Sequence, residues 1–417
     1  MVLDFLSNTR RKIYCTDGAK MSKEDRVLCI GSSFSAIPVL FVLKKYGFKV
    51  AVCGNQLNDP CHQYADESFY IDYSNKDALY GLVEREKFKY IIPTCNDYSY
   101  ISASYVANKL GYPGFDSDST VQIIHTKDAF RKYTTENKIN APRFCKFNFS
   151  DGVKCLYSIN LDYPLIVKPA NVFSGRGVSK VNNKDDLNDA VKFAYAASSS
   201  KSIVVEEFKY GTLHSHSALI KNGTIFTEFF VDEFCTVYPY QVNCSNHPSR
   251  LSEETRRNVR ENVIKMISSL QLVDGLLHTQ FIYNDDTEDI WIIESMRRAP
   301  GDLYGKLVER STGFDYFDAY VRPFIKKEFL TGYRKGSEKY YGRHTVSVAE
   351  NSSCFSFINK IPGKNMETVM LKSSGMPVEA APYDKLAIIF SEFDSADLML
   401  RTVPFLESYI QINTVNN

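Results

Sequence analysis

A strand–helix–strand unit near the start of the chain constrains the fold more than any other part of the sequence. Residues 26–30 (RVLCI) and 48–53 (FKVAVC) are short apolar runs, and the residues between them have a helical pattern that ends at Gly47. Strands joined by such a helix run parallel in one sheet. A further apolar run at 89–94 and a helical pattern at 99–112 continue the alternation. We therefore predict a Rossmann-like α/β domain over residues 1–125.

The pattern changes after about residue 126, where strands also pair through hairpins. It predicts a helix at 126–139 capped by Thr126, strands at 162–169 and 202–208, helices at 183–197 and 253–270, and hairpins at 214–230 (around Asn222-Gly223) and 276–296. This mixture is typical of an α+β domain, which we place at 126–330. Short strand-like runs and a helical pattern at 395–410 predict a smaller C-terminal lobe at 331–417.

The composition limits the partners that we expect. The chain has 50 lysines and arginines against 49 aspartates and glutamates, and this net charge of +1 gives no support for a broad face that binds nucleic acid or membrane. Its 10 cysteines form no C-x-x-C pair, which is typical of reduced thiols in a cytoplasmic protein. We therefore expect a cytoplasmic protein with no nucleic-acid or membrane partner.

The second hairpin places two polar side chains opposite one another. If its loop is Asp285–Asp289, Gln280 pairs with Glu294, and Ile282 pairs with Ile292. Opposed residues of an antiparallel pair have their side chains about 4.5–5.5 Å apart on one face. Two oxygen donors so placed suit a hard cation such as Mg²⁺. A hydrogen-bonded Gln–Glu pair at a solvent-facing edge explains the same spacing equally well.

Residues 167–181 (VKPANVFSGRGVSKV) contain a strand end followed by a glycine loop. Two glycines around a cation, Gly175-Arg176-Gly177, suggest a loop that closes over phosphate, although the pattern is not G-x-x-x-x-G-K-[ST]. A surface turn is the alternative. After the second hairpin, Arg297 and Arg298 precede Pro-Gly, which indicates either an anion site or a solvated basic turn in which Arg297 points outward.

These motifs follow one another in a fixed order that resembles the ATP-grasp superfamily over nearly the whole chain. LIVKPA (165–170), SGRGV (174–178), VVEEF (204–208) and HTQF with IIESMRR (278–281 and 292–298) carry the resemblance. It implies an ATP-grasp architecture. A Rossmann-like pre-ATP-grasp domain precedes a two-lobed nucleotide-binding domain that begins at TKDAF (126–130), and a small C-terminal lobe follows.

The resemblance also implies a role for each matched residue. Lys127 and Lys168 bind the ATP phosphates, Ser174, Gly175 and Gly177 cover the triphosphate, Glu206, Glu207 and Phe208 hold the adenine, His214 meets the ribose, Gln280 and Glu294 bind Mg²⁺ (Mn²⁺ being the alternative ion), and Arg298 contacts the transferred phosphoryl group. The family usually has an asparagine two residues after the second metal carboxylate, whereas this chain has Met296. A thioether is a poor ligand for Mg²⁺.

The activity implied by this resemblance is ATP-dependent ligation of a small carboxylate to an amine, amino acids among them. The carboxylate takes the terminal phosphoryl group of ATP, and the acyl phosphate is then attacked by the amine, so that ADP and phosphate are released. Lysines, an arginine and Mg²⁺ suit the charge that spreads over the transferring oxygens. Two alternatives stay open: a bicarbonate-activating enzyme, similar to carbamoyl-phosphate synthase or biotin carboxylase, and a nucleotide-binding module that has lost turnover. The resemblance is also compatible with a homodimer.

Overall fold

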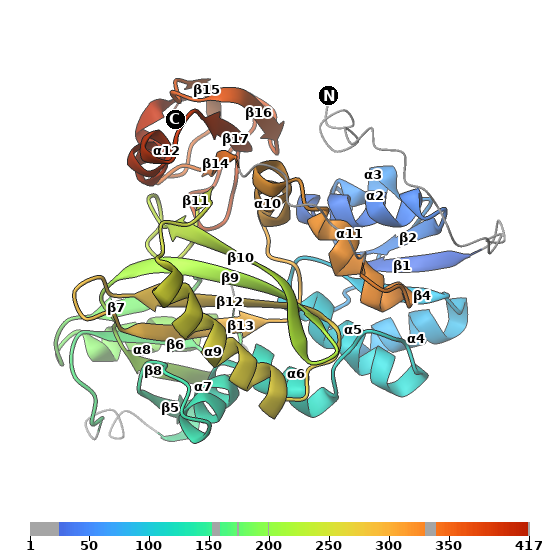
Figure 1. Ribbon diagram of the computed structural model, residues 1–417, viewed down its shortest axis with the longest axis horizontal. Helices are drawn as coiled ribbons and strands as arrows, with labels where there is room; N and C mark the ends of the chain where they lie inside the picture. The colour runs from blue at the N-terminus through green and yellow to red at the C-terminus, as the bar shows by residue number, and fades with distance from the viewer. Residues whose placement is uncertain (1–24, 152–158, 173–174, 199, 330–338, 416–417) are drawn as a thin grey trace.

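The computed structural model describes residues 25–151, 159–172, 175–198, 200–329 and 339–415 (Figure 1). Its first part contains a parallel four-stranded sheet in the order β3-β2-β1-β4. The strands are β1 (Arg26–Ile30), β2 (Lys49–Cys53), β3 (Glu67–Phe69) and β4 (Tyr90–Pro93). Because β1 pairs in parallel with both β2 and β4, the predicted α/β class of this part is confirmed.

Helices cover both faces of this parallel sheet. They are α2 (Ile37–Lys45), α3 (Cys61–Tyr64), α4 (Lys76–Glu86), α5 (Asp97–Leu110) and α6 (Asp118–His125), together with α11 (Tyr316–Val321) from much later in the chain. On β1, Val27 faces α2 and α11, whereas Leu28 faces α4 and α5. The hydroxyl of Tyr320 donates to the carbonyl of Pro93 (3.0 Å), which ties α11 to the sheet edge.

The second part contains a small antiparallel sheet in the order β5-β8-β6-β7. Its strands are β5 (Phe144–Asn148), β6 (Leu165–Pro169), β7 (Ser179–Val181) and β8 (Ser202–Glu207), and its helices are α7 (Lys127–Glu136) and α8 (Leu187–Ala197). The helix expected at 183–197 is confirmed as α8, whose apolar stripe is buried on the sheet. The expected cap at Thr126 is wrong, because its side chain accepts no bond from the start of α7.

The larger sheet has eight strands in the order β13-β12-β9-β10-β11-β14-β17-β16. They are β9 (Thr212–Lys221), β10 (Thr224–Phe234), β11 (Cys244–His247), β12 (Gly275–Tyr283), β13 (Ile290–Met296), β14 (Tyr340–Val346), β16 (Lys364–Met370) and β17 (Ala387–Phe393). Both predicted hairpins are therefore observed. Helix α9 (Glu253–Ser269) lies across this sheet (Figure 1) and packs Val259, Val263 and Met266 onto one face.

The C-terminal segment extends this same sheet. Strand β14 pairs with β11, so that strands from residues 340–393 continue the strands of the central part without a break. The remaining elements are β15 (Cys354–Asn359) paired with β18 (Ile410–Val415), the helices α10 (Tyr304–Thr312) and α12 (Ala396–Thr402), and short 3-10 helices at Phe34–Ala36, Phe149–Asp151, Arg322–Ile325 and Val403–Tyr409. The helix expected at 395–410 is divided because Phe405, which follows Pro404, leaves the helical conformation.

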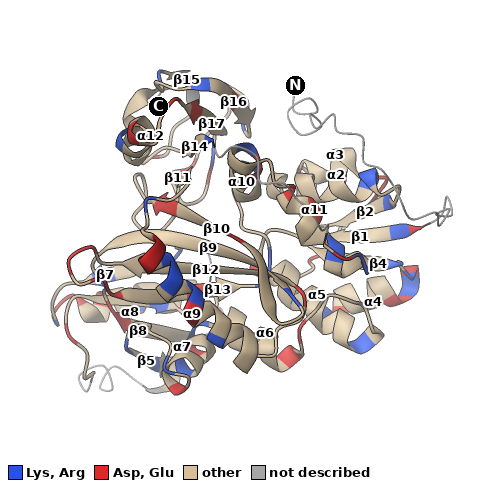
Figure 2. Ribbon diagram, in the orientation of Figure 1, with Lys and Arg blue, Asp and Glu red and all other residues tan. Residues whose placement is uncertain are grey.

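Lysines and arginines are interspersed with aspartates and glutamates over all three parts of the fold, and α9 carries both signs (Figure 2). Within the described residues, no helix is long and apolar enough to cross a bilayer.

Candidate functional site

The hairpin of β12 and β13 carries the expected pair. Gln280 lies directly opposite Glu294, as predicted, although the register near the turn differs from the predicted one by one residue. The pairing predicted between Ile282 and Ile292 is wrong, because Ile292 pairs with Phe281. A β-bulge between Gln280 and Phe281 causes this shift and leaves Ile293 as the extra residue. The guanidinium of Arg131 on α7 holds the bulge by donating to the carbonyls of Ile293 (2.6 Å) and Ile292 (3.3 Å).

Strand pairing also decides which side chains share a face with Gln280. Its partner on β9 is Ser215, so His214, one residue earlier, lies on the opposite face. The sequence predicts a ribose contact at His214. The structure instead buries its ring, with Nδ1 bonded to Asp232 (2.8 Å), Nε2 bonded to the Thr212 hydroxyl (2.7 Å) and the ring stacked on Phe281. We therefore give His214 no role in the site.

Lys127 and Lys168 approach Glu294 from the smaller lobe. Lys127 begins α7 and is half-buried, and Lys168 lies on β6 and is buried. The Lys127 ammonium donates to the carbonyl of Val172, at the start of the glycine loop. Burial, followed by the repulsion of Lys168, lowers the pKa of Lys127 to about 8. Glu294 lies within electrostatic reach of Lys127, Lys168 and Arg298, so the structure brings these predicted residues together.

A buried ion-pair triad supports Lys168. The carboxylate of Glu206 on β8 accepts from Lys168 Nζ (2.8 Å) and from Arg131 Nε (2.8 Å). The sequence predicts an adenine contact at Glu206, but its side chain is used within the protein. Sequence reasoning missed Arg131, although it lies four residues after Lys127 and therefore on the same side of α7. Because Arg131 also holds the bulge, the triad connects the lysine strand to the hairpin of Glu294.

The remaining predicted adenine contacts lie at the end of β8. The carboxylate of Glu207 accepts from Arg143 Nε (2.7 Å) and Lys209 Nζ (2.9 Å), so its side chain is also used within the protein. The amide of Phe208 donates to the carbonyl of Pro164 (2.9 Å). An adenine contact at Glu207 or Phe208 stays a prediction.

The glycine loop packs against the segment between β10 and β11. Gly175 and Gly177 have φ values of +71° and +74°, a region that favours glycine. The hydroxyl of Tyr238 donates to the carbonyl of Gly175 (3.1 Å), and a Cβ on Gly175 would lie 2.3 Å from the carbonyl oxygen of Tyr240. Ser174, expected to contact the triphosphate, lies outside the described residues. Glycine is thus required where the loop meets the tyrosine segment.

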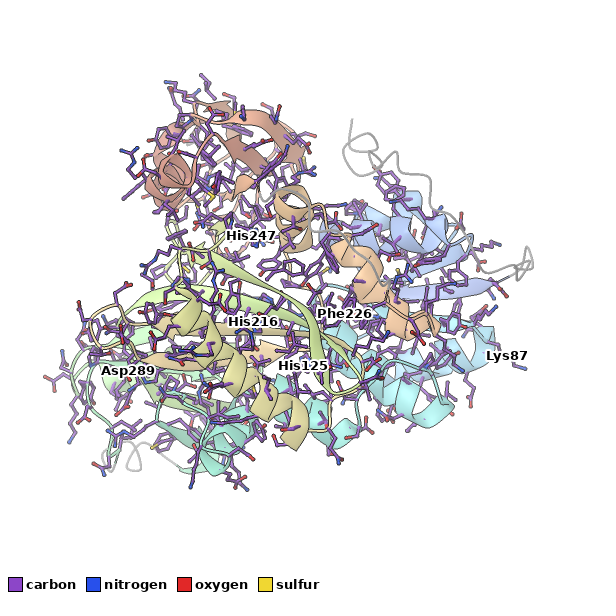
Figure 3. The ribbon with its side chains drawn as sticks, viewed as in Figure 1. Lys87, His125, His216, Phe226, His247 and Asp289 are labelled. Carbon is purple, nitrogen blue, oxygen red and sulfur yellow. The ribbon has the colours of Figure 1, made fainter. Side chains whose placement is uncertain are left out.

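Arg298 is held by the N-terminal part of the fold. Its Nη2 and Nε donate to Asp97 Oδ2 (2.7 and 3.2 Å). The other carboxylate oxygen of Asp97 is hydrogen-bonded to Nδ1 of His125 (2.9 Å), which is labelled in Figure 3. Burial alone would raise the pKa of Asp97, but Arg298 and His125 hold it below its usual range. Arg297 does not point outward. Its buried guanidinium donates to Asp116 Oδ2 (2.6 Å), a structural pair that leaves Arg298 as the candidate for anion contact.

Glu233 on β10 is a member of the site that sequence reasoning missed. Its carboxylate is 4% exposed and accepts from the Gln280 side-chain amide at 2.5 Å. Burial is the main cause that raises the pKa of Glu233 to about 7, and the charge of Glu294 adds to it. Strand pairing gives Val231 and Glu233 the same face as Ser215, but residues 229–234 (FFVDEF) have no alternation that could have revealed this face in the sequence.

These donors fit a magnesium ion. Gln280, Glu294 and Glu233 supply oxygen atoms on or beside one sheet face, which is the chemistry that Mg²⁺ prefers. No cluster of three or more histidines, cysteines, aspartates or glutamates suited to a metal occurs among the described residues. An ion here would therefore depend on ligand oxygens such as those of phosphates. Met296 is buried opposite His278 and supplies no oxygen.

A small cavity lies beside Glu294 and Met296. This cavity of about 20 Å³ lies between the hairpin and α7, with room for about one water molecule. Its walls include Asp97, His125, Lys127, Arg131, Glu294 and Met296. Residues from the N-terminal part, α7 and the β12–β13 hairpin therefore meet in one place.

Comparisons with known proteins show which families and structures the chain is similar to. Residues 146–303 match the family model described as D-ala D-ala ligase C-terminus. The chain is 28% identical over 187 residues to a formate-dependent phosphoribosylglycinamide formyltransferase of Methanocaldococcus jannaschii, which covers 44% of this chain and 47% of that protein. It is 24% identical over 308 residues to the enzyme of the same name from Prochlorococcus marinus, covering 72% and 76%.

A solved structure has a similar fold over nearly the whole length of this chain. The L-amino acid ligase from Bacillus licheniformis superposes with a TM-score of 0.78 at 18% identity, and the match covers 95% of this chain and 100% of that chain. The agreement extends from the parallel N-terminal sheet through both lobes to the C-terminal strands. These matches support an ATP-grasp architecture for the chain, and residues 146–303 are similar to the family described as D-ala D-ala ligase C-terminus.

Proposed function

We propose that the protein is an ATP-dependent carboxylate–amine ligase that works through an acyl phosphate and releases ADP and phosphate. The observation that carries this proposal is the meeting of three cationic side chains, Lys127, Lys168 and Arg298, around Glu294 and its partner Gln280. Cations so placed would stabilise the charge on the transferring phosphoryl oxygens. Magnesium, held by Gln280 and Glu294, would supply further neutralisation of the phosphates.

The proposed reaction has two steps. A carboxylate oxygen of the first substrate attacks the terminal phosphorus of ATP, and ADP leaves. The amine nitrogen of the second substrate then attacks the acyl carbon, phosphate leaves, and the nitrogen loses a proton. In this scheme Lys127 and Lys168 hold the phosphates, and Arg298, oriented by Asp97, contacts the transferred group. Closure of the glycine loop on the Tyr238 segment would exclude water from the acyl phosphate.

Two comparisons support the choice of substrates. A formate-dependent formyltransferase pairs a small carboxylate with an amine-bearing acceptor, and an L-amino acid ligase joins amino acids. The substrate panel should therefore combine formate and amino acids as carboxylates with amino acids and phosphoribosylglycinamide as amines. We expect ADP and phosphate to appear only when both substrates are present.

The matched control for this assay is Glu294→Gln, which keeps the shape of the side chain and removes its charge. It should abolish the release of ADP and phosphate. Formation of AMP and pyrophosphate would contradict the acyl-phosphate mechanism. Dependence on bicarbonate in place of an organic carboxylate would favour the alternative of a bicarbonate-activating enzyme.

A further inference from the structure

Glu233 is a buried carboxylate without a salt bridge among the described residues, although the charge of Arg343 acts on it from further away. It is 4% exposed, and no lysine or arginine lies within ion-pair distance of it among the residues that the structure describes. Burial of a charged group is costly unless the group is paired and hydrogen-bonded. The negative charge of Glu294, which acts on Glu233, adds electrostatic repulsion to this cost. A cation bound beside these two carboxylates would offset this cost.

The contact between Glu233 and Gln280 sets the direction of the Gln280 amide. The Gln280 Nε2 donates to a Glu233 oxygen at 2.5 Å. In its ionised form Glu233 only accepts, so it selects the NH₂ end of the amide and turns the carbonyl oxygen away from itself. On the other side of Gln280 lies Glu294, its direct partner on β13. The oxygen of Gln280 is therefore presented toward the side of Glu294.

The same contact explains why position 280 carries an amide. A carboxylate at this position would lie against Glu233, and two carboxylates in contact repel one another unless they share a proton. With glutamine, the hairpin and β10 together still contain two carboxylates, Glu233 and Glu294, around one amide. The hydroxyl of Ser215 on the intervening strand also bonds to Glu233 and holds it in this position.

We infer that Glu233 is a positioning residue of the metal site, which orients the Gln280 oxygen toward the ion and supplies the second negative charge near it. This inference rests on the proposed function, because it assumes that Gln280 and Glu294 bind the ion. It adds a third strand, β10, to a site that the sequence places on the hairpin of β12 and β13 alone.

The test is Mn²⁺ binding to the full chain in the presence of a non-hydrolysable ATP analogue, followed by electron paramagnetic resonance. Glu233→Gln should weaken Mn²⁺ binding about 10–100-fold, the range found when the partner of a metal ligand is removed. The double variant Gln280→Glu with Glu233→Gln exchanges the two groups and keeps both the hydrogen bond and the net charge. It should recover most of the lost affinity. Circular dichroism checks that each variant is folded.

Two further variants make the outcomes distinguishable. Glu228→Gln removes another carboxylate of β10 that faces α9, where it binds Arg260 and His216 (labelled in Figure 3), so Mn²⁺ affinity should not change. Glu294→Gln should abolish binding. The inference is wrong, while the metal site stands, if Glu294→Gln abolishes Mn²⁺ binding but Glu233→Gln does not weaken it. The same conclusion follows if the exchanged double variant binds Mn²⁺ as weakly as Glu233→Gln. If Glu294→Gln has no effect, the proposed function itself loses its metal site.

Discussion

Asp97 and Arg298 lie 201 residues apart in the chain, yet Arg298 Nη2 donates to Asp97 Oδ2 at 2.7 Å. Asp97 begins α5 in the N-terminal part, and Arg298 follows the hairpin that carries Glu294. The pair therefore joins the parallel-sheet domain to the proposed site of phosphoryl transfer. His125 occupies the second oxygen of Asp97, so the carboxylate is held from both sides.

Asp97→Asn should lower kcat more than it weakens ATP binding, because Arg298 loses the anion that orients it while the two lysines are untouched. Loss of one partner of a buried ion pair should also cost about 3–5 kcal/mol of unfolding free energy. Asp116→Asn is the matched control, since it breaks the neighbouring buried pair with Arg297. That variant should lose stability but keep the kcat of the folded protein. Equal losses of kcat in both variants would contradict a specific role for Asp97.

The value of kcat/KM for ATP should fall as the pH rises through about 8, because the pKa of Lys127 is lowered to about 8 and the neutral amine no longer attracts phosphate. The sign follows from burial, which favours the uncharged form of a lysine. Lys127→Arg keeps its charge over this range, so its profile should stay flat to a higher pH. A profile of Lys127→Arg that falls at the same pH as the wild type would assign the titration to another group.

Glu206→Gln should destabilise the fold by roughly 3–5 kcal/mol, because it leaves Lys168 and Arg131 buried without their shared anion. Urea unfolding measures the loss. Asp189→Asn on α8 breaks a solvent-exposed pair with Lys192 and should cost less than about 1 kcal/mol. A loss for Glu206→Gln no larger than that of the control would show that the triad does not stabilise the lobe.

Gly175→Ala should slow turnover about tenfold, a change in rate that corresponds to roughly 1.4 kcal/mol. The added methyl group would meet the carbonyl oxygen of Tyr240 at 2.3 Å. Gly223→Ala is the control, because that glycine has the same φ of +71° but nothing within 4 Å of its added Cβ. Backbone strain alone would affect both variants equally, so the difference in their steady-state rates isolates the contact between loop and tyrosine segment.

Met296→Asn should tighten Mn²⁺ binding in the complex with the ATP analogue, because an amide oxygen replaces a thioether beside Glu294. The titration should then show either higher affinity or a second bound ion. An unchanged titration would mean that position 296 does not reach the ion, and that the methionine gives no support to a loss of turnover.

The sequence predicts the parts of this site that depend on local pattern. The β12–β13 hairpin follows from its two apolar runs, and the strand that bears Lys168 follows from its own apolar run, but the pairing of Gln280 with Glu294 also depends on the bulge. The bulge at Ile293 could not be predicted, since it is stabilised by Arg131 from 162 residues earlier in the chain. The sequence also could not show on which face of β9 the side chain of His214 lies. Both faces of β9 are buried, and the run HSHS is polar at every position, so it lacks the alternation that would reveal its orientation.

The central claim, transfer of the terminal phosphoryl group of ATP to a carboxylate, is tested most directly by an oxygen label. The carboxylate of an active substrate pair is enriched in ¹⁸O, and the phosphate released during ligation is analysed by mass spectrometry. The acyl-phosphate account predicts one ¹⁸O atom in each phosphate, because the oxygen that attacked phosphorus leaves with it when the amine attacks the acyl carbon. Unlabelled phosphate, or label found in AMP, would contradict it.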